Sequence, residues 1–192
     1  MERTLIPGYT IGADAYDDIV NICAQYGKKA AIIGGRQALA AARDNILRAI
    51  DGSPIESLGC FWYGGECSYE NVDMLEPQVR EADMLFAVGG GKAIDTCKVL
   101  AHRTGRPFFT FPTIASTCAS CTSLGIVYHP DGRTIPSPRS RPAIFLSIRK
   151  SSPTLPTVIS GPGWAIRWQS VMNARSLPAE TPPLIPTPWA SL

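Results

Sequence analysis

The sequence predicts an α/β fold in which a Rossmann-like, doubly wound parallel sheet carries helices on both faces. Its short predicted strands are apolar throughout and do not alternate, which is typical of parallel strands buried on both faces. Segments with apolar residues at helical spacing separate these strands, so strands and helices alternate along the chain. Right-handed connections between parallel strands then place the helices on both sides of the sheet.

The first elements follow from apolar spacing and from turn residues. A helix is expected over about residues 13–26, and the apolar run Lys29–Ile33 is a buried strand that glycines close. Apolar residues on one face predict a second helix over 36–50. Asp51-Gly52 ends it.

The later elements repeat this rhythm. Apolar runs predict strands at 60–63, 84–88, 107–111 and 124–128. Helices are expected over 72–79 and from the glycine-rich segment to about residue 103. The aromatic residues of the strands, Trp62 among them, are expected to lie in the core.

Composition divides the chain near Arg133. Residues 1–132 carry 11 Lys and Arg against 15 Asp and Glu, whereas residues 133–192 carry seven against one. Eleven of the 17 prolines lie in the second part, which leaves no room there for a helix of useful length. We therefore expect an α/β domain over 1–132 and a Pro-rich, poorly folded tail over 133–192.

The N-terminus lacks the basic start and the long apolar run of a signal peptide, and no apolar run is long enough to span a membrane. We therefore expect a cytoplasmic protein without a membrane partner. In that reducing compartment the six cysteines are expected to be free thiols. Cys118 and Cys121 form an isolated CxxC, without the second pair or the histidines that a zinc site needs.

The richest candidate site is VGGGKAID at 88–95, where a predicted strand passes into a helix. Ligands bind beyond the carboxyl ends of parallel strands, and glycines let a phosphate approach the backbone closely. The helix N-terminus would offer free N–H groups and a positive dipole, to which Lys92 adds charge. The alternative is a plain strand-to-helix turn, since the spacing matches neither GxGxxG nor the P-loop.

A second candidate loop, PTIASTCASCTS at 112–123, follows another strand and is dense in small hydroxyl residues. These hydroxyls would bind a cofactor or would only cap turns and the next helix. GGGKAIDTCK at 89–98 and PTIAST at 112–117, with Leu124 and Tyr128 at matching spacing, together resemble the glycerol dehydrogenase branch of the iron-containing (metal-dependent) alcohol dehydrogenase family. The resemblance is close over residues 84–132.

The resemblance implies an N-terminal α/β domain that binds NAD and a C-terminal helical domain that holds a catalytic zinc or iron. It implies a small-molecule alcohol or hydroxy acid as substrate, no nucleic-acid partner, and a possible homo-oligomer for the intact enzyme. The cofactor contacts that it implies are Gly91, Lys92, Ala93, Ile94, Asp95, Thr113, Ile114, Ala115, Ser116, Thr122, Leu124 and Tyr128.

Two positions depart from the family pattern. The acidic residue that binds the adenosine ribose corresponds to Gly34, which cannot accept the ribose hydroxyls, so the choice between NAD and NADP stays open. The aspartate that contacts glycerol corresponds to Cys118, and a thiol is a poor substitute for a carboxylate that binds a polyol. This second departure resembles the hydroxycarboxylate dehydrogenase relatives, where losing a negative charge favours an anionic substrate.

After residue 132 the family pattern disappears. The resemblance implies Ala-Gly-x-Gly-Asp-x-x-Ala-Lys, whose Asp is the first metal ligand, and then two histidines, but residues 133–192 contain no Asp and no His. Read in a neighbouring frame, the back-translated tail permits Ala-Gly-Met-Gly-Asp-Thr-Leu-Ala-Lys. Trp164-Ala165 forces one Gly, and Trp168-Gln169 forces the last Ala. We infer a frameshift near Arg133; the alternative is a natural tail of disordered composition.

Three functions therefore compete. The first is an NAD- and metal-dependent polyol dehydrogenase of the glycerol type, present as a frameshifted fragment that lacks its helical metal domain and is inactive alone. The second is the same chemistry on 2-hydroxy or 2-oxo acids, which Cys118 suggests. The third is a nucleotide-binding remnant without catalysis. His102 and His129 are interpreted as a helix-face and a turn residue, so no metal site is expected in this chain.

Overall fold

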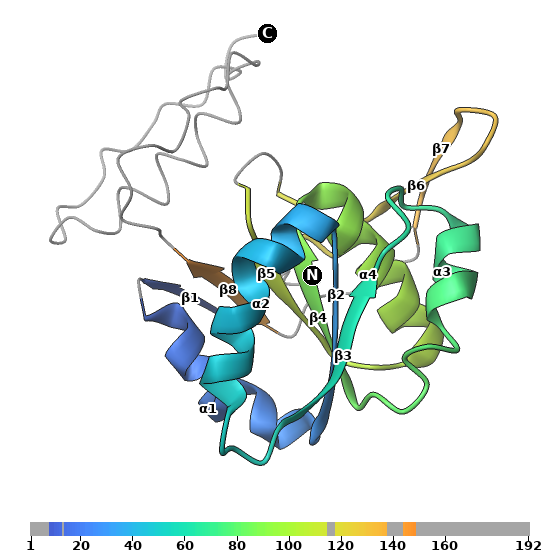
Figure 1. The fold of residues 1–192 in the computed structure, drawn as a ribbon. Coiled ribbons are helices and arrows are strands. Elements are labelled where there is room, and N and C mark those ends of the chain that lie inside the picture. The colour runs from blue at the N-terminus through green and yellow to red at the C-terminus, as the bar shows by residue number, and fades with distance from the viewer. Residues whose placement is uncertain (1–7, 13, 115–117, 138–143, 149–192) are drawn as a thin grey trace, which may run out of the picture. The chain divides into compact units, whose positions relative to one another are not determined.

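The computed structural model describes residues 8–12, 14–114, 118–137 and 144–148 (Figure 1). The chain divides after Thr157 into two units, and every described residue lies in the first. No helix among the described residues is long and apolar enough to cross a membrane.

Six strands form one sheet in the order β1-β8-β5-β4-β2-β3, and every neighbouring pair is parallel. The strands are β1 (Gly8–Gly12), β2 (Lys29–Gly34), β3 (Glu56–Trp62), β4 (Met84–Gly89), β5 (Phe108–Pro112) and β8 (Ile144–Ile148). The prediction of a parallel, Rossmann-like sheet is confirmed.

Helices cover both faces of this sheet (Figure 1). They are α1 (Ile19–Cys23), which lies between short 3-10 helices at Ala15–Asp18 and Ala24–Tyr26, then α2 (Arg36–Ile50), α3 (Tyr69–Leu75) and α4 (Gly91–Thr104). Ile32 and Phe86 belong to a core cluster that includes residues of α1 and α2. Ile33 and Leu85 belong to a second cluster with residues of α3 and α4. Successive side chains of a strand thus enter opposite cores, which explains why the strands are apolar throughout.

The predicted strand at 124–128 does not join the sheet. Its shorter form β6 (Ile126–Tyr128) instead pairs antiparallel with β7 (Thr134–Pro136). The turn between them is closed by the Arg133 N–H, which donates to Asp131, and by the His129 N–H, which donates to the Arg133 carbonyl. The chain reverses in this turn, so β6 finds its partner eight residues later and not in the parallel sheet.

Helix α3 begins and ends earlier than the predicted 72–79. The Ser68 hydroxyl accepts a hydrogen bond from the Asn71 N–H and caps its start. Pro77, which follows two residues after the helix, has no N–H to continue the ladder.

Two described strands, β7 and β8, lie beyond residue 132, where the sequence indicates a poorly folded tail. β8 is parallel to both β1 and β5 and lies between them in the sheet. The tail residues other than 133–137 and 144–148 lie outside the described residues.

The strand order reverses at β2. The chain moves outward from β2 to β3 and then returns to the other side of β2 to form β4. Connections on either side of such a reversal diverge and leave a crevice at the carboxyl ends of the two central strands, where ligands of open α/β sheets bind. The fold therefore predicts a ligand-binding crevice at the carboxyl ends of β2 and β4.

Candidate functional site

A cleft of about 1070 Å³ lies at this edge of the sheet. Its walls come from the ends of β3 and β4, the residues that follow β2 and β5, the first turns of α2 and α4, and residues in and before β6. Most of the predicted cofactor contacts line it: Gly91, Lys92, Ala93, Asp95, Thr113, Ile114, Thr122, Leu124 and Tyr128. The side chain of Ile94 instead belongs to the core, where it is 1% exposed. Ala115 and Ser116 lie outside the described residues.

The glycine-rich segment is a strand-to-helix turn at the carboxyl edge, as its sequence predicts. Gly89 ends β4 with a φ of +140°, a conformation that a residue with a Cβ rarely adopts. Gly90 precedes α4, and its carbonyl accepts the first helical hydrogen bond, from the Ile94 N–H at 3.1 Å. The N–H groups of Gly91, Lys92 and Ala93 therefore come before the helical ladder, at the positive end of the helix dipole. An anion in the cleft would meet these three groups.

Lys92 lies in the cleft wall, but its charge is already partnered. Its ammonium donates a hydrogen bond to Glu66 and lies 5.5 Å from the centre of the Tyr128 ring. The hydrogen bond to Glu66 raises the pKa of Lys92 above its usual range. Glu66 precedes α3 and lies 26 residues before Lys92 in the sequence. No local sequence pattern predicts that the two side chains form a pair. The charge of Lys92 is therefore largely balanced by Glu66, and Lys92 does not act in the cleft as a free cation.

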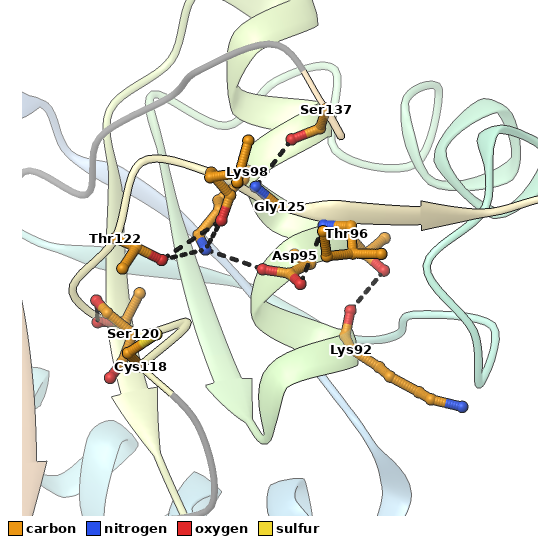
Figure 2. A network of polar contacts seen from close by, with 12 residues as sticks. Lys92, Asp95, Thr96, Lys98, Cys118, Ser120, Thr122, Gly125 and Ser137 are labelled. Carbon is orange, nitrogen blue, oxygen red and sulfur yellow. Dashed lines mark hydrogen bonds and ion pairs between the residues drawn. The ribbon is translucent and has the colours of Figure 1, made fainter. Parts of the chain in front are cut away.

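Asp95 takes part in a buried network that Figure 2 shows. Its side chain accepts hydrogen bonds from the Lys98 ammonium at 2.8 Å and from the Ile126 N–H at 3.2 Å. Lys98 has no exposed side-chain surface, and it also donates to the Thr122 hydroxyl at 3.3 Å and to the Leu124 carbonyl at 2.7 Å. Helix α4 thereby fixes the 122–126 segment, which forms one wall of the cleft.

A second contact holds the same segment from the other side. The Gly125 N–H donates to the Ser137 hydroxyl at 3.0 Å (Figure 2). The Ser137 N–H in turn donates to the Gly125 carbonyl at 2.8 Å. A Cβ on Gly125 would stand 2.8 Å from that hydroxyl oxygen, so the pair leaves no room for a side chain. Lys98 and Ser137 together position the segment that carries the predicted contacts Thr122 and Leu124. Lys98 and Ser137 themselves are not among the predicted contacts.

The loop after β5 reaches the glycine turn. The Thr113 N–H donates to the Gly89 carbonyl at 3.2 Å, and Ile114, which is 56% exposed, lies beside Gly90. Cys118 is half-buried and lines the cleft. Cys121 is a free cysteine, and both its thiol and its backbone N–H donate a hydrogen bond to the Cys118 carbonyl. Burial raises the pKa of the Cys121 thiol.

The described residues contain no group of three or more His, Cys, Asp and Glu side chains that are placed to hold a metal ion. The described donors therefore do not fit a catalytic zinc, which takes three protein ligands.

Gly34, the position expected for the ribose-binding acid, lies next to a residue that lines the cleft. Gly34 is the last residue of β2, and a Cβ there would lie 2.4 Å from the Val88 carbonyl oxygen, so no side chain fits. Gly35 is the residue that lines the cleft, and a Cβ there would only touch the Tyr63 ring at 3.5 Å. Gly34 and Gly35 both lack a carboxylate, so neither offers an acid for the ribose hydroxyls.

The expectation that Trp62 is a core residue is wrong. Trp62 is the last residue of β3, is 44% exposed and lines the cleft, with the Arg36 guanidinium 5.2 Å from its ring centre. β3 is an edge strand, and its end is not covered by a neighbour on both sides. The neighbouring Tyr63 donates its hydroxyl to the Gly65 carbonyl at 2.8 Å, and burial raises its pKa.

Known proteins resemble this chain in both sequence and fold. The model of the family described as iron-containing alcohol dehydrogenase matches residues 7–146. Glycerol dehydrogenase of Thermotoga maritima is 44% identical over 71 residues, which are 36% of this chain and 20% of that protein. Hydroxycarboxylate dehydrogenase A of Escherichia coli is 36% identical over 108 residues, 56% of this chain and 29% of that protein.

Solved structures agree on the fold. A probable glycerol dehydrogenase from Sinorhizobium meliloti superposes with a TM-score of 0.64 at 27% identity, covering 77% of this chain and 41% of the other. Glycerol dehydrogenase from Schizosaccharomyces pombe gives a TM-score of 0.68 at 24% identity, covering 77% and 39%. The chain spans less than a third of the length of the two curated relatives named above. Since the family model matches well over half of its residues, the chain belongs to the iron-containing alcohol dehydrogenase family.

Proposed function

We propose that the cleft binds a nicotinamide dinucleotide and that the chain is the cofactor-binding part of a dehydrogenase for small alcohols of the glycerol type. The observation that carries this proposal is the turn at 89–91, which opens three helix N-terminal N–H groups onto the cleft at the switch point. The pyrophosphate would lie against the Gly90–Lys92 backbone. The similarity to glycerol dehydrogenases supports the alcohol substrate.

The chain's own residues would bind and orient the cofactor, which supplies the hydride acceptor. Thr113, Ile114, Thr122, Leu124 and Tyr128 line the same cleft and would border the bound cofactor. The network of Lys98 and Asp95 keeps the 122–126 segment in place before a ligand arrives. Such a pre-formed cleft reduces the ordering that binding would otherwise require.

We propose that this chain binds the cofactor without turning over substrate. The described donors do not fit the metal that the family name implies, and residues 133–192 carry neither Asp nor His. In our proposal the α/β domain includes strand β8, and the part of the chain beyond it, which should supply the metal ligands, is read out of frame. Restoring the frame would restore the metal site and the activity.

A second substrate class has one specific observation in its favour. Cys118, at the position expected to contact the substrate, lines the cleft with a thiol in place of a carboxylate. A carboxylate there would repel an anionic substrate, and a thiol does not. The similarity to hydroxycarboxylate dehydrogenase A supports 2-hydroxy acids as this alternative, and substrate profiling of the frame-restored protein separates it from glycerol.

The variant Gly90→Val tests cofactor binding. Gly90 has an extended backbone that valine tolerates, but the new Cβ would lie 2.6 Å from Ile114 Cδ1 and would fill the approach to the N–H groups. We expect the dissociation constants of both NADH and NADPH to rise at least tenfold, about 1.4 kcal/mol, in isothermal titration calorimetry of the 192-residue chain.

Ala40→Val is the matched control for this experiment. It adds the same branched side chain on the exposed side of α2, away from the cleft. Its dissociation constants should equal those of the parent, and thermal unfolding of both variants checks that they fold. Unchanged constants for Gly90→Val would exclude the glycine turn as the phosphate site, and a parent chain that binds neither dinucleotide would contradict the proposed function.

A further inference from the structure

Arg36 is an uncommitted cation at one end of the cleft. It is the first residue of α2, it is exposed, and its guanidinium lies over the exposed ring of Trp62. Lys92, the other basic residue of the described cleft lining, is paired with Glu66, whereas no described carboxylate forms an ion pair with Arg36. The cation–π contact with Trp62 uses no N–H hydrogen bond of the guanidinium, so these donors could bind an oxyanion.

The backbone beside Arg36 adds to this positive potential. Gly35 caps α2, a helix of 15 residues, and the first helical hydrogen bond runs from the Leu39 N–H to the Gly35 carbonyl at 2.8 Å. The N–H groups before Leu39 therefore face outward at the positive end of the helix dipole. The first turn of α2 contains no acidic residue to offset them.

Gly35 is a glycine although its conformation does not require one. Its φ is −75°, and a Cβ there would make only an ordinary contact with the Tyr63 ring. A carboxylate at this position would hydrogen-bond the adenosine ribose hydroxyls and would repel a phosphate. The structure has room for a Cβ at this position, and the sequence places a glycine there, next to an arginine.

We infer that the cleft prefers the 2′-phosphorylated dinucleotide, NADP or NADPH, and that Arg36 binds the 2′-phosphate. The inference rests on the proposed function, since it assumes that a nicotinamide dinucleotide occupies the cleft. Arginine matches a phosphate with two parallel hydrogen bonds, and an arginine beside the ribose is how dinucleotide-binding folds accommodate the 2′-phosphate. The resemblance implied NAD, so this inference departs from it.

Isothermal titration calorimetry of the 192-residue chain with NADPH, NADH, adenosine 2′,5′-bisphosphate and adenosine 5′-phosphate tests the inference without any turnover. We expect NADPH to bind at least tenfold more tightly than NADH, and the bisphosphate to exceed the monophosphate by a similar factor. Arg36→Ala should abolish both preferences, because it should lower the affinity for NADPH at least tenfold more than the affinity for NADH. Arg36→Lys should restore the preference only in part, because an ammonium lacks the planar fork.

Gly35→Asp provides the reciprocal change, which should reverse the preference in favour of NADH. Arg43→Ala is the matched control, since Arg43 lies on the same helix, beside Asp44 and outside the cleft lining. Its preference should equal that of the parent.

Three outcomes would overturn the inference in distinguishable ways. NADH binding as tightly as NADPH would refute the preference and leave the proposed function standing. A preference for NADPH that survives Arg36→Ala would refute the role of Arg36. Failure of the parent chain to bind either dinucleotide would refute the proposed function, and the inference with it.

Discussion

Replacing Lys98 with methionine should destabilise the chain by about 3 kcal/mol. The Lys98 side chain has no exposed surface, and its ammonium bonds Asp95, Thr122 and the Leu124 carbonyl. Removing one partner of a buried ion pair typically costs about 3 to 5 kcal/mol, because the other charge stays buried without compensation. Asp95 would keep the Ile126 N–H, and its side chain is 13% exposed, which places the loss at the lower end of that range.

Urea unfolding followed by circular dichroism measures this loss, and Lys92→Met is its matched control. Lys92 lies on the same helix and also pairs with a carboxylate, Glu66, but both side chains are more than a third exposed. Exposed pairs contribute about 0 to 1 kcal/mol, so the control should change the free energy of unfolding by less than about 1 kcal/mol. Equal losses for the two variants would refute the reasoning that burial of the network stabilises the fold.

Two further predictions concern pH and thiol chemistry. Hydrogen bonds from the Lys29 and Lys28 N–H groups lower the pKa of Asp83, so its stabilisation is present above the unfolded pKa, about 3.9, and is lost as pH falls through the folded pKa. Urea unfolding between about pH 2 and pH 6 should show a weaker loss of stability towards acid in Asp83→Asn than in the parent, and identical profiles would contradict this. Burial raises the pKa of Cys67 to about 12, so a thiol-specific reagent at neutral pH should leave Cys67 unmodified in the native chain and modify it in urea, as mass spectrometry would show. Rapid native labelling of Cys67 would contradict its burial.

The sequence predicts the interior of this fold better than its edges. Strands β2, β4 and β5 are short apolar runs because their side chains enter a core on each face, and local composition is enough to find them. β1 was missed because Gly8–Gly12 mixes glycines with polar residues. β8 was missed because its apolar stretch lies within the Pro-rich part of the chain.

In the candidate site, too, the sequence predicts the local features but not the contacts between distant residues. The glycine turn at 89–91 is a local feature, so its sequence alone predicts both its conformation and its place at the sheet edge. The partners Glu66 of Lys92 and Trp62 of Arg36 are 26 residues apart in each case, and only the folded sheet brings them together. Lys98 was present in the matched motif, but nothing local indicates that its ammonium reaches the 122–124 segment.

The central claim is that this chain holds the cofactor-binding part of a dehydrogenase without its metal-binding part. The most direct test is the absorbance of reduced nicotinamide that forms from NAD or NADP with glycerol and with 2-hydroxy acids, in the presence of zinc. The purified 192-residue chain and a version with the reading frame restored near Arg133 are compared. We predict turnover by the frame-restored protein and none by the 192-residue chain, and turnover by the 192-residue chain would contradict the account.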